Sequence, residues 1–289
     1  MITLSKTVMG ETACRSKREA VSDFLREFVQ RQLSDLNISV ILHGSYATGT
    51  ITAFSDIDLL AFIPSNRDGN YSCLIDHRLR RLTFQLHRID PLMHHNVDVV
   101  DERNFENYDE STLPIDAISQ SVILLGSPTL SISPNLQLSK ANAAAKLVKT
   151  CNSIILFQDT VVNRTPYRIK CLISALFLVP ILLLQSHKGM FLYKRESLAL
   201  AEKFYGNVID FRAIYLATKM RSEWHLSRSS VVVRKTLIPF ESCLYSPLWL
   251  QRISGSLFPV KKSVYQELLR ESKRFVGDVL LYAKQNDIT

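Results

Sequence analysis

The chain has 289 residues, of which 46% are hydrophobic and 21% are charged, and this composition excludes extensive disorder. Its five cysteines lie far apart without a C-x-x-C pair, which disfavours both a disulfide framework and a thiolate zinc site. Charged residues precede any apolar run at the N-terminus, so we expect a cytoplasmic protein rather than a secreted one.

The net charge of +8 is unevenly distributed along the chain. Residues 1–139 contain 12 Lys/Arg and 17 Asp/Glu, a net charge of −5, whereas residues 140–289 contain 23 and 10, a net charge of +13. This difference predicts two domains, and the positive second half is suited to a polyanionic partner. Residues 127–138, rich in Ser, Pro and Asn, are the expected linker.

The first half of the chain alternates between helical and strand patterns. Ser16 and Glu19 have the spacing of a capping box, which predicts that an amphipathic helix begins there and ends at about Leu36. A strand at 38–42 leads into a turn at Gly44-Ser45. The other expected elements are strands at 56–63, 96–100 and 122–125 and helices at 71–88 and 115–119.

The second half shows mainly helical periodicity. Helices are expected at 139–158, 166–186, 195–205, 209–223 and 261–284, with an irregular stretch at 239–259. The apolar run 171–184 is too short for a bilayer span and contains Pro180, so it predicts a buried helix and no membrane partner. The fold class that follows is α/β (α+β), a small mixed-sheet domain followed by an all-helical domain.

Two acids one residue apart, Asp56 and Asp58, are the strongest functional signal in the sequence. On a strand both side chains would point to one face, while Ile57 and Leu59 would point into the core. Paired carboxylates are typical ligands of magnesium, which completes its coordination with water and substrate phosphates. The pair therefore predicts a metal site.

A phosphate-binding turn is predicted just before these acids. Gly44 and Ser45 follow the first strand, where glycine lets a polyanion approach the backbone N–H groups and serine adds a hydroxyl donor. Asp98, between two valines on a later strand, is the best candidate for the third carboxylate of a two-metal site. Asp101 is a weaker candidate, because it lies at the strand end and is expected to be solvated.

In combination, Gly44-Ser45, ten intervening residues, Asp56-Ile57-Asp58 and a later Asp98 resemble the active-site signature of the polymerase-β-type nucleotidyltransferases, over residues 16–128. The resemblance implies transfer of NMP from an NTP to an acceptor hydroxyl, with release of pyrophosphate. It implies that the three acids hold two Mg²⁺ ions, which Mn²⁺ can replace, and ATP is the default donor. Residues 1–130 would then be the catalytic domain and residues 139–289 a basic domain that binds the acceptor or a partner.

Several other residues have weaker functional interpretations. Lys194, beside Arg195 at an expected helix start, is a candidate contact to the triphosphate or the acceptor, although such residues are usually solvated. Arg221 and His225 lie four residues apart, close to the spacing of some ribonuclease sites, but a surface pair is the preferred interpretation. A metal role for the histidines is weakly supported as well; these are His43, His94 and His95. The same holds for a phosphate-loop role of Thr48, Gly49 and Thr50.

The motif does not determine the acceptor. The positive second half favours RNA or another nucleotide, because polyanions gain from counterion release on Lys/Arg surfaces. Nucleotidylation of an acidic protein partner, modification of a small molecule such as an antibiotic, and synthesis of cyclic oligonucleotides remain open. A catalytically idle binding module is the non-enzymatic alternative, and the retention of three acids disfavours it.

Overall fold

The computed structural model describes residues 2–3, 12–52, 54–64, 69–89, 96–126, 129–160, 162–164, 166–223 and 261–288. It divides into two compact units, of which the first consists of Met1–Asp109 and Ile115–Asn135 and the second of Glu110–Pro114 and Leu136–Thr289. The first unit contains a small mixed sheet with helices and the second is helical, so the predicted α+β class is confirmed.

The first unit is built on a four-stranded sheet in the order β4-β3-β2-β5. Its strands are β2 (Ser39–His43), β3 (Asp58–Ile63), β4 (Asp98–Asp101) and β5 (Val122–Leu125). β2 is antiparallel to both β3 and β5, whereas β3 and β4 are parallel, so β4 forms an edge of the sheet. Two further short strands, β1 (Ile2–Thr3) and β6 (Thr129–Leu130), pair with each other.

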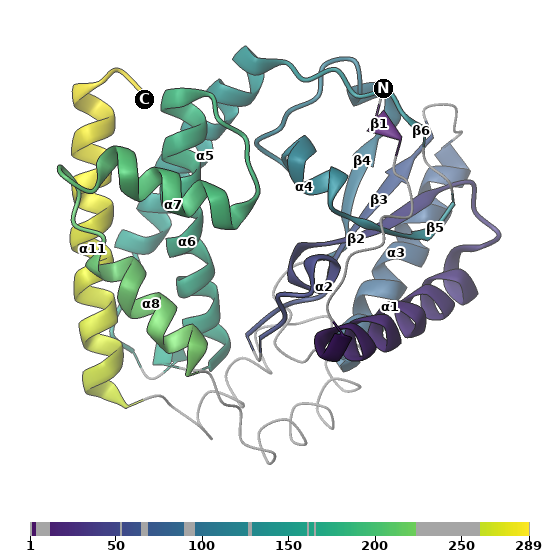
Figure 1. Ribbon diagram of the computed structural model, residues 1–289, viewed down its shortest axis with the longest axis horizontal. Helices are drawn as coiled ribbons and strands as arrows, with labels where there is room; N and C mark the ends of the chain where they lie inside the picture. The colour runs from purple at the N-terminus through teal and green to yellow at the C-terminus, as the bar shows by residue number, and fades with distance from the viewer. Residues whose placement is uncertain are drawn as a thin grey trace. The chain divides into compact units, whose positions relative to one another are not determined.

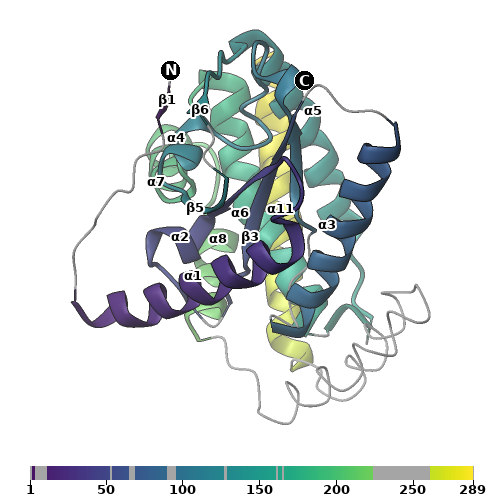
Figure 2. The same cartoon turned by 90° about the vertical axis from the view of Figure 1, so that its right-hand side faces the viewer.

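Two long helices cover one face of this sheet (Figures 1 and 2). They are α1 (Thr12–Leu33) and α3 (Gly69–Ile89), and three short elements complete the unit: α2 (Gly44–Thr48), the 3₁₀ helix η1 (Glu102–Asn104) and α4 (Ile115–Ser119). Leu25, Val29 and Leu33 of α1 are fully buried against alternate strand residues. Ile57 and Leu59 lie in the same cluster, which confirms that they point into the core. Because successive side chains on a strand point to opposite faces, the residues buried under α1 and α3 determine which residues point to the other face of the sheet.

Several predicted boundaries in the first unit were wrong. α1 begins at Thr12, four residues before the predicted capping box at Ser16, because the helical pattern continues on the N-terminal side. β3 begins at Asp58 rather than Asp56, and β4 begins at Asp98, so Asp98 is the first residue of its strand. Part of the expected linker is instead ordered as β6.

The second unit is a helical assembly around α6 (Figure 1). It contains α5 (Leu136–Ile155), η2 (Val162–Arg164), α6 (Pro166–Lys188), α7 (Lys194–Tyr205), α8 (Arg212–Ser222) and α11 (Lys262–Gln285). α6 packs against α5, α7, α8 and α11, which accounts for its apolar sequence on all sides. The five predicted helices are confirmed to within a few residues at each end, and the predicted irregular stretch 239–259 lies outside the described residues.

The helix α6 is the one segment of the described chain that is long and apolar enough to cross a membrane, over Tyr167–Lys188. Within the second unit, however, 78% of its most apolar window is buried by other helices. Leu172, Leu176 and Leu183 are fully buried. The segment therefore lies in the core of the second unit, and the predicted buried helix is confirmed.

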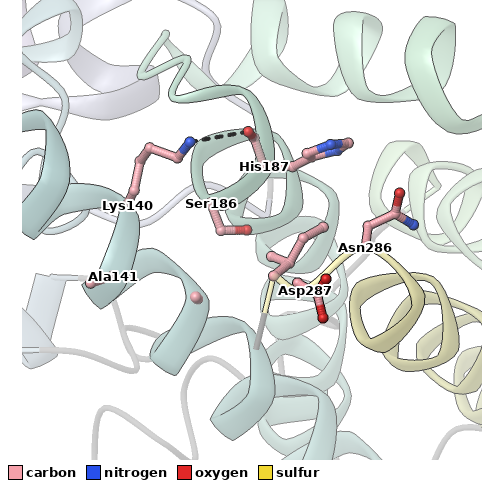
Figure 3. Close-up of a pocket in the computed structure, with 8 residues that line it drawn as sticks. Lys140, Ala141, Ser186, His187, Asn286 and Asp287 are labelled. Carbon is pink, nitrogen blue, oxygen red and sulfur yellow. Dashed lines mark hydrogen bonds between the residues drawn. The ribbon is translucent and has the colours of Figure 1, made fainter.

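A cavity of about 340 Å³ lies in the second unit, where the end of α6 meets α5 and the end of α11 (Figure 3). The Lys140 ammonium donates a hydrogen bond of 3.3 Å to the His187 carbonyl oxygen, and the His187 ring stacks on Tyr205 with centroids 5.9 Å apart. Partial burial and the charges of Lys188 and Lys140 lower the pKa of His187. The ring is therefore neutral at physiological pH.

We expect His187 to make stability fall on acidification. An unfolded chain takes up a proton at the ordinary histidine pKa of about 6.5, whereas the folded chain resists that proton, so stability is lost as pH decreases through the lowered folded pKa. In the His187→Gln variant the difference in unfolding midpoint between about pH 7.5 and about pH 5.5 should be smaller than in the wild type. Equal pH dependence of the two proteins in thermal unfolding monitored by circular dichroism would contradict this assignment.

Candidate active site

Gly44, directly after β2, lies close to the side chain of Asp58, the first residue of β3. Gly44 has φ +72°, and a Cβ built on it would lie 3.0 Å from the Asp58 carboxyl carbon and would clash with Oδ2. Any other residue at position 44 would have to displace this carboxylate. The glycine is therefore required by its neighbour as well as by its own backbone conformation.

Gly44 and Ser45 begin the short helix α2, where the sequence predicted only a turn. The Thr48 hydroxyl donates to the Gly44 carbonyl oxygen at 3.2 Å, and the Thr50 N–H donates to the Ser45 carbonyl oxygen at 3.0 Å. Gly49 ends the helix in the left-handed conformation, with φ +78°. Thr48, Gly49 and Thr50 thus have a structural role in closing α2.

Asp56 follows a tight turn that leads into β3. The Ser55 hydroxyl oxygen accepts from the Thr52 N–H at 2.9 Å, and the Ser55 N–H donates to the Thr52 carbonyl oxygen at 3.1 Å. Asp56 is 9% exposed, whereas Asp58 is partly buried. Burying a carboxylate is costly unless charged or polar groups compensate for it, so the position of Asp56 is unusual for an acid with only a surface role.

The strand register places Asp58 and Asp98 on one face of the sheet. Asp98 pairs with Leu60, two residues after Asp58, and side chains two residues apart on a strand share a face. Leu60 lies outside the cluster beneath α1 and α3, so this is the face opposite the two helices. Standard strand spacing puts the two Cα atoms roughly 8 Å apart. Asp98 is exposed at the sheet edge.

Asp101, the weaker third acid, has a structural role instead. Its carboxylate accepts hydrogen bonds from the Arg103 N–H at 2.9 Å and from the guanidinium at 3.0 Å and 2.7 Å. The Asp101 side chain is 11% exposed, so the expectation that it would be solvated was wrong. It caps the 3₁₀ helix η1.

Among the described residues, no three His, Cys, Asp or Glu side chains are arranged to hold one metal ion. The metal role of Asp56, Asp58 and Asp98 therefore stays a prediction. Their chemistry is nevertheless suited to magnesium, because all three donors are carboxylates and two of them share a sheet face. His94, His95 and His225 lie outside the described residues.

Residues 21–125 match a family model described as a nucleotidyltransferase domain. This part of the first unit is therefore similar to a nucleotidyltransferase domain, in agreement with the resemblance of the sequence to the polymerase-β type. No curated protein matches the chain. The nucleotidyltransferase domain includes the whole four-stranded sheet together with Gly44, Ser45 and the three acids. A match to this kind of domain supports a general nucleotidyl transfer activity and implies an NTP as the substrate.

The helical unit lies outside the matched nucleotidyltransferase domain. Lys194 is the first residue of α7 in that unit, with its ammonium 5.4 Å from the centre of the Phe177 ring. Sequence reasoning did not single out Phe177. It lies in the apolar run of α6, and nothing in the sequence distinguishes it from its neighbours.

Proposed function

We propose that the chain is a metal-dependent enzyme that transfers NMP from an NTP to an acceptor hydroxyl and releases pyrophosphate. The acceptor that we favour is RNA or another nucleotide, and ATP is the default donor. The observation that carries the proposal is the approach of Gly44 to the Asp58 carboxylate, on a sheet face that Asp98 shares.

The proposed reaction is an in-line displacement at the α-phosphorus. The acceptor oxygen forms a bond to the α-phosphorus, the bond from that phosphorus to the bridging oxygen breaks, and pyrophosphate leaves with the bonding electrons. Gly44 and Ser45 would bind triphosphate oxygens through their N–H groups and the serine hydroxyl. Asp98, the exposed acid, is assigned to accept the proton of the acceptor hydroxyl.

Asp56, Asp58 and Asp98 would together hold two magnesium ions, which manganese can replace. Bound magnesium supplies neutralisation of the charge on the reacting phosphate and on the leaving pyrophosphate. The partial burial of Asp58 and the low exposure of Asp56 would strengthen the attraction of these carboxylates for a cation. A cytoplasmic location fits this chemistry, because NTPs and magnesium are both available there.

Charge supports a polyanionic acceptor. Residues 140–289, which make up most of the helical unit, carry a net charge of +13, and such a surface attracts phosphates rather than cationic drugs. Small-molecule modification is therefore less favoured. An acidic protein partner would be attracted by the same field, and the transfer experiment separates these acceptors.

The test uses the purified full chain with Mg²⁺ or Mn²⁺ and each of the four NTPs labelled at the α-phosphate. RNA, mononucleotides and a cell extract serve as acceptors, and products are separated by size and identified by mass spectrometry. We expect label to move to a nucleic acid or nucleotide together with release of pyrophosphate. Label on protein would show that the acceptor is a protein and not a nucleic acid or nucleotide. Absence of both labelled product and pyrophosphate with every NTP would contradict the enzymatic function.

A further inference from the structure

An exposed tyrosine lies between two basic residues on one face of α8. Arg212, Tyr215 and Lys219 are separated by three and four residues, and side chains at these spacings are neighbours on a helix, with Cβ atoms roughly 5–6 Å apart. Tyr215 is 55% exposed, and Arg212 and Lys219 are exposed as well. We call these three residues the α8 stripe. Their proximity follows from the geometry of a single helix.

The two basic side chains of the α8 stripe are not neutralised by the rest of the described chain. Within residues 2–223 and 261–288, as far as the structure describes them, neither the Arg212 guanidinium nor the Lys219 ammonium forms an ion pair or a hydrogen bond. Both charges are therefore open to an anion from solution.

A further cation lies beside the start of the α8 stripe. The Asp210 carboxylate accepts a hydrogen bond of 3.0 Å from the Arg212 backbone N–H, and its other oxygen lies 3.8 Å from the Arg274 guanidinium of α11. Phe211 and Phe275, which follow Asp210 and Arg274 in the sequence, pack edge to face with ring centroids 5.5 Å apart. The Arg274 side chain is 61% exposed, so the positive surface continues from α8 onto α11.

The ring of Tyr215 is anchored although it is exposed. Its hydroxyl donates a hydrogen bond to the Glu202 carboxylate of α7. This hydrogen bond raises the pKa of Tyr215, so the ring is neutral at physiological pH. An anchored ring loses little conformational freedom when a flat partner stacks on it, and this preorganisation favours binding.

A ring flanked by cations is suited to single-stranded nucleic acid. Bases stack on aromatic side chains, while lysine and arginine attract the phosphates, and this combination is typical of proteins that bind single strands. In a duplex the bases are already stacked on one another, and an acidic peptide needs only the cations. The net charge of +13 on residues 140–289 would attract any of these polyanions, so the exposed ring is the feature that selects among them.

We propose that the α8 stripe binds a single-stranded RNA acceptor, with one base stacked on Tyr215 and phosphates bound by Arg212 and Lys219. That the RNA is an acceptor rests on the function proposed above, and the α8 stripe adds the strandedness of the RNA and the residues that hold it. Arg274 extends the positive field at one end.

The test measures binding of a short fluorescent single-stranded RNA to the full chain by anisotropy, without divalent metal, so that no transfer occurs. We expect Tyr215→Leu to weaken binding about tenfold, as for the loss of one stacked base, and Tyr215→Phe, which keeps the ring, to retain most of the affinity. The slope of log affinity against log salt should be unchanged in Tyr215→Leu. It should decrease by about 0.7 in each of Arg212→Met and Lys219→Met, as for one lost phosphate contact.

Two exposed residues elsewhere provide matched controls. Phe24 is 50% exposed on α1, and none of the residues three or four positions from it is basic. Lys284 is an exposed lysine near the end of α11, ten residues and therefore roughly 15 Å along the helix from Arg274. We expect Phe24→Leu and Lys284→Met to bind RNA within about twofold of the wild type, as for ordinary surface substitutions.

Several outcomes would overturn the proposal. Equal losses in Tyr215→Leu and Phe24→Leu, or in Lys219→Met and Lys284→Met, would show a diffuse surface rather than a site. Equal affinity for duplex RNA or for polyglutamate of the same charge would show that the ring does not select the ligand. A wild type that binds no RNA would also overturn the proposal, whereas release of pyrophosphate by that wild type with another acceptor would leave the proposed enzymatic function standing.

Discussion

Replacing Asp58 with asparagine is expected to abolish most nucleotidyl transfer while leaving the protein folded. The substitution keeps the shape of a side chain that lies against Gly44 and removes the charge that would bind a cation. Loss of one preorganised group that stabilises charge in the transition state lowers kcat by at least about 100-fold. The measurement is initial rates of transfer of α-labelled NMP under saturating magnesium.

Asp76 provides the matched control for this variant. It is an exposed acid on α3, the helix that packs on the opposite face of the sheet, so Asp76→Asn makes the same chemical change away from the site. It should retain transfer within about twofold, as for an ordinary surface substitution. Equal rates for wild type and Asp58→Asn would remove this carboxylate from the proposed mechanism.

Adding a single methyl group at Gly44 is expected to affect both stability and activity. In Gly44→Ala the new Cβ would clash with the Asp58 carboxylate, and alanine is strained at φ +72°. The strain should lower the free energy of unfolding by about 1–3 kcal/mol. The displaced carboxylate should lower transfer by about 100-fold, the scale of the loss for a group misplaced by about 1 Å.

Two other glycines separate these effects. Gly126 has φ +75°, and its Cβ would lie 2.5 Å from the Ser39 hydroxyl oxygen, so Gly126→Ala should destabilise the first unit without reaching Asp58. Gly277, on α11, has open space around its Cβ, so Gly277→Ala should be neutral or stabilising by up to about 1 kcal/mol. Both variants are assayed at a temperature where they are folded. If Gly126→Ala then lost as much transfer as Gly44→Ala, the loss in Gly44→Ala would come from general destabilisation and not from displacement of the Asp58 carboxylate.

The sequence was most informative where a pattern is local. The alternation of Ile57 and Leu59 with the two acids, and the amphipathic pattern of the helix that ends at about Leu36, depend only on neighbouring residues, and both predicted elements contribute to the observed core. The pairing of β1 with β6 could not be predicted, because two-residue strands are too short to show a period. The capping box at Ser16 misled the prediction, since the helix continues through it to Thr12.

The geometry of the site depends on contacts that the sequence does not contain. The sequence predicted that Gly44 and Asp58 both have a role, but the approach of one to the other appears only when β2 and β3 pair. The face of Asp98 follows from its register with Leu60, and strand register is a tertiary property.

Counting the bound manganese ions is the most direct test of the central claim that Asp56, Asp58 and Asp98 form a two-metal site. Electron paramagnetic resonance titration of the full chain with Mn²⁺, in the presence of a non-reactive NTP analogue, measures binding independently of activity. We predict two ions per chain for the wild type, and weaker binding or fewer ions for Asp98→Asn. Identical titrations of the two proteins would contradict the claim.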